Sequence, residues 1–370
     1  MRVGYLVHDL NDAAVARRTA MLVRGGSEVR LAGFRRGGAA PATIQGAPTL
    51  DLGATADGAL KQRAAAVLRW SAWPGALARF FSCCDLLIGR NLETLALARR
   101  IVGGRPLVYE CLDIHRSLLG SGPSNRAVQQ VEAMMLSRVD LLLTSSPAFS
   151  REYFSKRPTL AAPTMLIENK LLQLSGDAPA HGQTPTNPPW VIGWFGMLRC
   201  RRTLSELIAL AATMQGQVKI LIAGKPSLAE FPTFEAEVGA AAHLTYLGPY
   251  RPEDLPSLYG RCHFAWAIDW FEEGLNSEWL LPNRLYEASA FGCVPIVLER
   301  MEVGRWLAAH DAGLRLRSGL EELIARLGSL DTEVYATMRQ RLLSIPAEKL
   351  IAGPVDCRAL VSRLVEVRHR

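Results

Sequence analysis

Three arginines follow an apolar run near the middle of the chain, where the sequence also predicts the start of a helix. The run covers residues 190–195, and the polar segment after it contains Gly196, Arg199, Arg201, Arg202, Thr203 and Glu206. Thr203 and Glu206 have the spacing of a capping box, which satisfies backbone N–H groups at a helix start. Guanidinium groups beside such N–H groups bind phosphate oxygens. The segment therefore predicts a phosphate or diphosphate site; the alternative is three solvated arginines on a loop.

A second motif, within residues 281–297, combines a predicted helix with a following apolar run. Pro282 opens the helix, and Arg284 and Glu287 share one of its faces because they are three residues apart. A carboxylate there could accept hydrogen bonds from both ribose hydroxyls, while Arg284 meets phosphate or the donor sugar. The alternative is an ordinary surface ion pair, which is the more common meaning of this spacing.

Polar residues in the first half follow predicted strands, where an acid or base facing a substrate would lie. They are Asp9 and Asp12 after the first strand, Arg90 and Asn91 after the third, and Asp113 and His115 after the fourth. The side chains of Asp113 and His115 could point the same way, since they are two residues apart. Each of these residues could instead cap a helix or complete a turn.

The elements that must position these residues follow a regular order. Apolar runs with β-branched residues alternate with amphipathic stretches in both halves of the chain, which is typical of parallel sheets covered by helices. The strands of the first half are expected at residues 2–7, 28–34, 85–88, 106–110, 140–144 and 165–167. Those of the second half are expected at 190–195, 218–223, 243–247, 263–268, 294–298 and 313–316. The Ala-, Gly- and Pro-rich residues 37–59 are expected to form a loop.

This alternation predicts an α/β protein with two tandem doubly wound domains facing across a cleft. The expected boundaries are 1–170 for the first domain, 171–189 for a Pro-rich linker, 190–345 for the second domain and 346–370 for a C-terminal helix. That helix could cross back to the first domain. Ligands of such sheets bind beyond the carboxyl ends of the strands, so the motifs above are expected at those edges.

Composition supports a globular, reduced protein. The chain has 370 residues, of which 49% are hydrophobic and 21% charged, and its seven cysteines form no CxxC pair. No apolar run approaches the roughly 20 residues needed to cross a bilayer, and no signal peptide is visible. We expect a cytoplasmic protein, with peripheral contact at the inner face of the cell membrane.

Charge is unevenly distributed along the chain. Residues 1–170 hold 22 Lys and Arg against 13 Asp and Glu, whereas residues 171–370 hold 20 against 22. Basic and aromatic residues, including Trp70 and Trp73, also mix within residues 61–81, as in helices that lie in the headgroup layer. The sequence thus predicts contact with an anionic membrane surface; a core-packed helix with a solvated basic face is the alternative.

Other functional classes lack their signatures in this sequence. There is no zinc or recognition-helix motif for nucleic acid, no GxGxxG after either first strand, and no nucleophile elbow. We therefore expect no nucleic-acid partner and neither dehydrogenase nor hydrolase chemistry.

The two motifs of the second half resemble those of the GT-B glycosyltransferases, specifically the retaining, nucleotide-sugar-dependent family 4 enzymes that include bacterial exopolysaccharide enzymes. Residues 282–288 with Gly292 and residues 295–297 look like the family's donor-site helix and following strand. The resemblance puts the ribose-binding acid on Glu287 and the basic residue of the phosphate loop on Arg202. It also implies donor contacts from Gly196, Arg199, Asn283 and Arg284.

The chain departs from the family pattern at three points. Glu278 and Glu287 are separated by eight residues where the family has seven. Met197 occupies the position of an arginine, leaving Arg199 or Arg201 to replace it. A histidine expected before the acid near the donor sugar falls on Leu112, with His115 displaced.

The resemblance implies transfer of a sugar from a UDP- or GDP-type donor to a saccharide acceptor that is lipid-linked, with retention and front-face attack by the acceptor. It implies no metal and no cofactor, which agrees with the lack of an Asp-x-Asp pair. Arg202, Asp113 and His115 would be the catalytic residues. A catalytically silent GT-B partner protein and a nucleotide-sugar epimerase are the alternatives.

Overall fold

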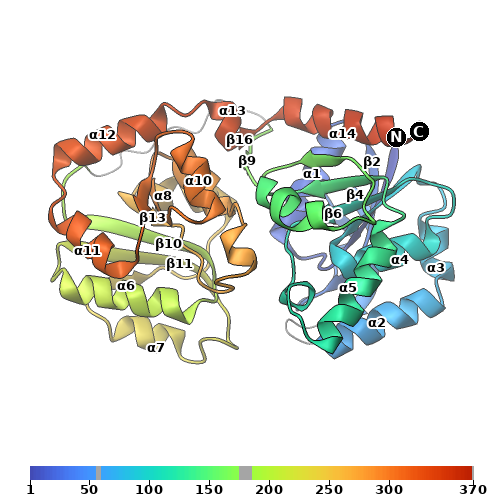
Figure 1. Cartoon of the computed structure of the whole chain (residues 1–370), viewed down its shortest axis with the longest axis horizontal. Helices are drawn as coiled ribbons and strands as arrows, with labels where there is room; N and C mark the ends of the chain where they lie inside the picture. Colours follow the sequence, from blue (N-terminus) through green and yellow to red (C-terminus); the bar gives the residue numbers. More distant parts are fainter. Residues whose placement is uncertain (56–59, 175–185, 369–370) are drawn as a thin grey trace. The chain divides into compact units, whose positions relative to one another are not determined.

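The structure, a computed structural model, describes residues 1–55, 60–174 and 186–368 and divides the chain into two compact units (Figure 1). Unit 1 comprises residues 1–168 and 352–370, and unit 2 comprises residues 169–351. Most of the expected linker, residues 175–185, lies outside the described residues, and β9 (Leu171–Leu172) falls within the rest of it. Residues 346–370 differ from the expected single helix, because α13 (Ala347–Leu350) ends before β16 (Ile351–Ala352) and α14 (Pro354–Arg368) follows.

Unit 1 is built on an eight-stranded sheet in the order β3-β4-β2-β1-β5-β6-β7-β8, in which only β3 and β4 pair antiparallel. The strands are β1 (Arg2–Val7), β2 (Glu28–Arg35), β3 (Thr43–Ile44), β4 (Ala47–Ala54), β5 (Leu86–Arg90), β6 (Leu107–Cys111), β7 (Leu141–Thr144) and β8 (Thr164–Leu166). The loop expected at residues 37–59 is wrong for β3 and β4, because β4 pairs in parallel with β2 and β3 pairs antiparallel with β4.

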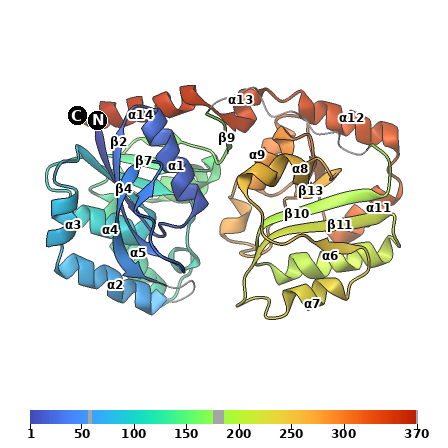
Figure 2. The same cartoon turned by 180° about the vertical axis from the view of Figure 1, so that it is seen from behind.

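The helices of unit 1 flank this sheet. They are α1 (Ala13–Arg24), α2 (Leu60–Ala72), α3 (Gly75–Phe80), α4 (Asn91–Ile101), α5 (Pro123–Leu136) and α14, with short turns η1 (Arg116–Leu118), η2 (Phe149–Tyr153) and η3 (Phe154–Lys156). Helix α14 packs on α1, as Figures 1 and 2 both show. Gly25 permits the close approach, since a Cβ there would lie 2.3 Å from the Cys357 carbonyl oxygen.

Unit 2 contains a fully parallel six-stranded sheet in the order β12-β11-β10-β13-β14-β15. Its strands are β10 (Trp190–Leu198), β11 (Val218–Pro226), β12 (Leu244–Tyr246), β13 (Phe264–Trp266), β14 (Val294–Leu298) and β15 (Leu314–Leu316). Its helices are α6 (Arg201–Thr213), α7 (Phe234–Gly239), α8 (Leu255–Tyr259), α9 (Asn283–Ala290), α10 (Glu302–Ala308), α11 (Leu320–Gly328), α12 (Thr332–Leu343) and α13, with turns η4 (Pro252–Asp254) and η5 (Asn276–Glu278).

The strand order locates the ligand edge of each sheet. The chain leaves β10 toward β11 and β12 and then returns to the other side of β10 with β13, so the direction of winding reverses between β10 and β13. The same reversal lies between β1 and β5 in unit 1. Doubly wound sheets bind ligands beyond the carboxyl ends of the strands at such a point. The predicted Rossmann-like architecture of both halves is confirmed.

Candidate functional site

Two glycines face each other near the carboxyl end of the β10–β11 pair in unit 2, two residues before both strands end. Gly196 and Gly224 are partners in the parallel register and have φ angles of +115° and +138°. These angles are open only to glycine at low cost. A Cβ on Gly224 would lie 1.8 Å from the Gly196 carbonyl oxygen. This edge is therefore bare backbone, and the two glycines let the backbones of β10 and β11 pack closely there.

Glu287 and Arg284 lie beside this bare edge, together with two tyrosines. The Tyr259 hydroxyl donates to Glu287 Oε2 over 3.2 Å, and Arg284 Nη1 donates to the Trp266 carbonyl oxygen over 3.3 Å. A Cβ on Gly196 would lie 4.0 Å from the Tyr250 hydroxyl. The structure thus brings Gly196, Arg284 and Glu287 together, whereas Asn283 is exposed at the first residue of α9.

Burial and charge mark the two tyrosines as part of this cluster. Burial raises the pKa of Tyr250 to about 12, with the charge of Glu287 adding to the rise and that of Arg284 opposing it. Burial, again reinforced by Glu287, raises the pKa of Tyr259 well above its usual value. Both hydroxyls therefore remain protonated at neutral pH and can donate hydrogen bonds. The sequence analysis missed them, although Tyr250 stands in a Gly-Pro-Tyr turn just after a strand.

Arg202 lies at the same edge in an ion-pair network. Its Nε donates to Glu206 Oε1 over 2.9 Å and its Nη1 to Glu273 Oε2 over 2.5 Å, and its guanidinium lies 3.6 Å from the centre of the Trp270 ring. The predicted capping box is wrong. Helix α6 begins at Arg201 with Cys200 as its N-cap, so Thr203 lies inside the first turn and the Glu206 carboxylate is used by Arg202.

The neighbouring arginines have separate partners. Arg199 is half-buried, with its guanidinium 4.5 Å from the centre of the Phe271 ring. Arg201 pairs with Glu237 over 3.0 Å and donates to the Glu230 carbonyl oxygen, which places it with the α7 segment and not with Arg202. Of the two possible replacements for the arginine missing at Met197, only Arg199 lies toward Phe271, just after β13.

Glu278 and Arg300 complete the network beside Arg202. Arg300 follows β14, and its guanidinium pairs with Glu273 over 3.0 Å and with Glu278 over 2.8 Å. Glu278 is therefore held by Arg300, and the sequence motifs gave no signal for Arg300.

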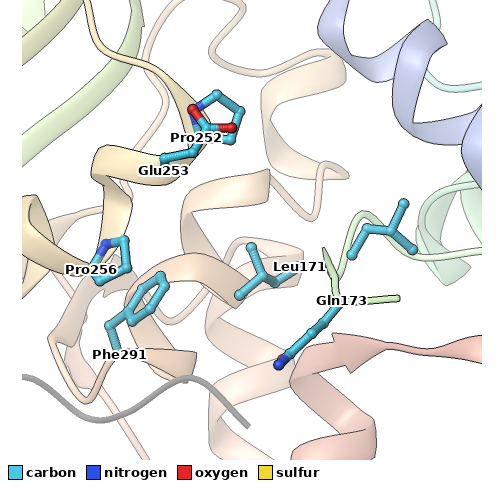
Figure 3. Close-up of a pocket in the computed structure, with 7 residues that line it drawn as sticks. Leu171, Gln173, Pro252, Glu253, Pro256 and Phe291 are labelled. Carbon is cyan, nitrogen blue, oxygen red and sulfur yellow. The ribbon is translucent and has the colours of Figure 1, made fainter. Parts of the chain in front are cut away.

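A shallow apolar pocket of about 300 Å³ lies on unit 2 close to α9 (Figure 3). Leu171 and Gln173 line one side, and Pro252, Pro256 and Phe291 line the other. The Phe291 ring stacks on that of Tyr259 at 5.9 Å between centres, so the pocket and the Glu287 cluster share an aromatic wall.

In unit 1, two of the predicted acceptor residues belong to a buried polar network. Arg90 is 1% exposed; it donates to the Tyr5 hydroxyl over 2.8 Å and pairs with Glu110 over 3.5 Å. Asp12 caps α1 by accepting from the Ala14 amide. Burial alone would raise the pKa of Asp12, but the hydrogen bond from His8 and the charge of Arg90 lower it. The prediction that Arg90 faces a substrate does not match this burial.

Asp9 and Asn91 have different surroundings. Asp9 accepts hydrogen bonds from the amides of Asn11 and Arg36, as a turn residue does. Asn91 has a φ of +68°, and its buried Oδ1 has no hydrogen-bond partner among the described residues. A left-handed backbone and an unpaired amide oxygen at the start of α4, beside the β1–β5 reversal, are features that concentrate at binding sites.

Asp113 and His115 follow β6. Asp113 is exposed, while His115 caps η1 by accepting at Nδ1 from the Ser117 amide over 3.2 Å. Burial, reinforced by Arg63 and Arg116, lowers the pKa of His115 below its usual value. The imidazole is therefore neutral at neutral pH.

The basic and aromatic segment 61–81 is divided between core and surface. The Trp70 indole donates to the Leu52 carbonyl oxygen, and Phe81 is fully buried. Trp73 is 74% exposed and Leu68 69% exposed. No helix in the described part of the chain is long and apolar enough to cross a membrane.

Comparisons with known proteins assign the family. No protein-family model matches the chain. The succinoglycan biosynthesis protein ExoL of Rhizobium meliloti is 42% identical over 375 residues, which cover 98% of this chain and 93% of that protein. The chain belongs to the same family as ExoL. The predicted resemblance to a bacterial exopolysaccharide family is confirmed by this match.

Solved structures support the fold of this ExoL family member. Sucrose-phosphate synthase from Thermosynechococcus elongatus superimposes with a TM-score of 0.73 at 15% identity, covering 99% of this chain and 98% of that one. HepE from Anabaena, solved in complex with UDP, gives a TM-score of 0.70 at 16% identity, covering 99% of this chain and all of that one. Identities this low establish the GT-B fold alone.

Proposed function

We propose that this protein transfers a sugar from a nucleoside diphosphate donor to a saccharide acceptor during synthesis of an exopolysaccharide of the succinoglycan type. The observation that carries the proposal is the cluster of Gly196, Arg284 and Glu287 at the β10–β13 reversal of a GT-B unit. The role of ExoL in succinoglycan biosynthesis and the UDP and UDP-glucose complexes of HepE support it.

In this proposal Glu287 binds the ribose hydroxyls, with Tyr250 and Tyr259 holding one wall. The diphosphate is bound by Arg199, Arg202 and Arg284, and Asn283 and the bare backbone at Gly196 complete the donor site. During transfer the bond between the anomeric carbon and the diphosphate oxygen breaks. The acceptor oxygen bonds to that carbon on the same face, and its proton passes to the departing diphosphate. The arginines stabilise the charge that develops on the leaving group, without a metal ion.

On the acceptor side, the proposal assigns contacts to Asp113, His115 and Asn91 of unit 1, with Asp9 at the neighbouring strand end. Neutral His115 suits hydrogen bonding to a sugar hydroxyl. Arg90 and Asp12 would have a structural role, stabilising the strand ends of unit 1 that carry these contacts. The acceptor would be lipid-linked.

Nucleotide titration tests the donor site. Wild-type protein is expected to bind UDP or GDP, and Glu287→Ala to lose about tenfold or more in affinity, because a hydrogen bond to a charged group contributes about 1.5–3 kcal/mol. Glu333→Ala, an exposed acid on α12, is the matched control. Equal affinities for wild type and Glu287→Ala would exclude Glu287 from the site.

Product analysis separates the candidate activities. Release of nucleoside diphosphate together with a glycoside of unchanged anomeric configuration supports a retaining transferase. Interconversion of the nucleotide sugar would indicate an epimerase, and binding without turnover a catalytically silent partner protein.

The same proposal includes peripheral contact with an anionic membrane through Leu68 and Trp73 of unit 1. Trp73→Ser should reduce flotation with vesicles that contain phosphatidylglycerol. Leu228→Ser is the matched control, since Leu228 is equally exposed at 76% but lies in unit 2. If Trp73→Ser protein floats like wild type, this surface does not bind membranes.

A further inference from the structure

Two arginines that follow the strands on either side of β13 pack against the ring of Trp270 in unit 2. Arg202 follows β10 and Arg300 follows β14, while Trp270 follows β13, which lies between them in the sheet. The Arg202 and Arg300 guanidinium carbons lie 3.6 and 5.7 Å from the centre of the Trp270 ring. Trp270 is 7% exposed, so the ring is a fixed surface against which these flexible side chains pack.

The Glu206 carboxylate hydrogen-bonds to both Arg202 and Trp270. One carboxylate oxygen, Oε1, accepts from Arg202 Nε over 2.9 Å, and the other, Oε2, accepts from the Trp270 indole Nε1 over 2.8 Å. A single carboxylate therefore sets the orientation of both the guanidinium and the ring. Arginine side chains carry about 2 kcal/mol of rotamer entropy, and this arrangement removes much of it before any ligand binds.

Glu273 bridges the two arginines through both of its carboxylate oxygens. Its Oε2 lies 2.5 Å from Arg202 Nη1 and its Oε1 lies 3.0 Å from Arg300 Nη2. These side chains are each about 40–50% exposed, so the bridge is accessible to solvent. An oxyanion between two guanidinium groups is the arrangement that arginine forks provide for phosphate.

We propose that Trp270 is a positioning residue for the donor diphosphate. Together with Glu206, it holds the Arg202 guanidinium in the orientation that binds the diphosphate. Glu273 accepts hydrogen bonds from both arginines until the diphosphate replaces it. The inference rests on the proposed function and adds Arg300 as a second cation for the donor. Glu273 leaves because its carboxylate lies between the two guanidinium groups and repels the like-charged diphosphate. Binding therefore exchanges one bridging anion for another of higher charge.

The phosphate-dependent part of nucleotide affinity tests this assignment. The probes are the nucleoside diphosphate that wild type binds, its parent nucleoside, and inorganic pyrophosphate, each titrated into the full-length protein. Trp270→Leu should weaken the diphosphate about fivefold to tenfold, the size of a partly desolvated cation–π contact, with nucleoside affinity unchanged. Trp270→Phe should retain part of the diphosphate affinity, because a ring remains for Arg202 although the bond to Glu206 is lost.

Glu273→Gln provides the opposite change. Without the competing charge, pyrophosphate and the nucleoside diphosphate should bind about twofold to fivefold more tightly, within the range for exposed ion pairs. Glu237→Gln is the matched control, since Glu237 pairs with the adjacent Arg201 over 3.0 Å and has no contact with Trp270. It should leave both affinities unchanged.

The outcomes separate this inference from the proposed function. If wild type binds no nucleotide, the donor site itself is wrong. If wild type binds the diphosphate but Trp270→Leu keeps the wild-type ratio of diphosphate to nucleoside affinity, Trp270 does not position Arg202. If Trp270→Leu weakens the nucleoside as much as the diphosphate, the substitution has damaged the whole site, and Trp270→Phe is the deciding variant. A wild-type ratio of diphosphate to nucleoside affinity in Trp270→Phe also overturns the role of the ring. Equal pyrophosphate affinity for Glu273→Gln and Glu237→Gln would overturn the exchange.

Discussion

Both units gather arginines and carboxylates at the carboxyl ends of parallel strands, but they bury them to different degrees. In unit 1, Glu110 is completely buried and accepts from Arg18 Nε over 2.5 Å and from the Tyr5 hydroxyl, with Arg90 at 3.5 Å. In unit 2, Arg202 and Glu273 are about 40–50% exposed. The same residue types therefore form a structural network in one unit and an exchangeable one in the other.

The two networks differ because solvent water weakens ion pairs that are exposed to it but not those that are buried. Burial alone would raise the pKa of Glu110, but the charges of Arg18 and Arg90 and the Tyr5 hydrogen bond lower it below its usual value. Its ionised form is thus stable only while these partners remain in place. Around Arg202, solvent screens each pair to about 1 kcal/mol or less, and a ligand anion can replace a carboxylate at little energetic cost.

The largest expected effect is on the buried network. Glu110→Gln should lower the free energy of unfolding of unit 1 by about 3–5 kcal/mol, because it leaves two buried guanidinium groups without their anion. Urea unfolding followed by circular dichroism measures the change. Glu93→Gln, which breaks the half-buried pair of Glu93 with Arg63, is the control and should cost about 1 kcal/mol or less. Equal costs for the two variants would mean that burial does not distinguish the networks.

Acidification should reduce this difference. The pKa of Glu110 is lowered by folding, so its contribution is complete above the unfolded-state value of about 4.3 and is lost as the pH falls below it. The gap in unfolding free energy between wild type and Glu110→Gln should be largest at neutral pH and narrow below about pH 4–5. A gap that stays constant down to pH 3 would contradict an ionised Glu110.

A smaller effect is expected at Asn91, next to the buried network. Its φ of +68° is costly for a residue with a Cβ and cheaper for asparagine and glycine. Asn91→Ala should lower stability by about 1 kcal/mol, whereas Asn91→Gly should match or exceed wild type. Thermal unfolding ranks the three proteins. If Asn91→Gly keeps its stability but weakens acceptor use, the amide has a binding role separate from the backbone.

The smallest effect on stability is expected in the exposed network. Arg300→Gln should change the free energy of unfolding by about 1 kcal/mol or less, since Glu273 and Glu278 remain solvated. Urea unfolding in low and high salt checks this, because an exposed pair weakens with ionic strength. A loss close to that of Glu110→Gln would show that the Arg202–Arg300 network is structural as well.

Much of the fold could be predicted because its signals are local. Alternating apolar runs predicted the strands of both sheets except β3 and β4, and the motifs around Thr203 and Pro282 predicted helix starts close to those of α6 and α9. The predicted capping box failed because Glu206 has a stronger partner, Arg202, one turn away. The strand β4 was missed because pairing with β2, not its own composition, makes it a strand.

The sequence by itself determined two Rossmann-like units, the position of Gly196 after an apolar run and of Glu287 on a helix, and the family resemblance, since these depend on spacing along the chain. Only the tertiary structure decided that Arg90 is buried while Arg202 is exposed, and that Tyr250, Trp270 and Arg300 lie at the carboxyl edge of the unit 2 sheet. Burial and contact depend on residues far apart in the sequence. An arginine's environment, and so its role, is therefore not encoded in its local motif.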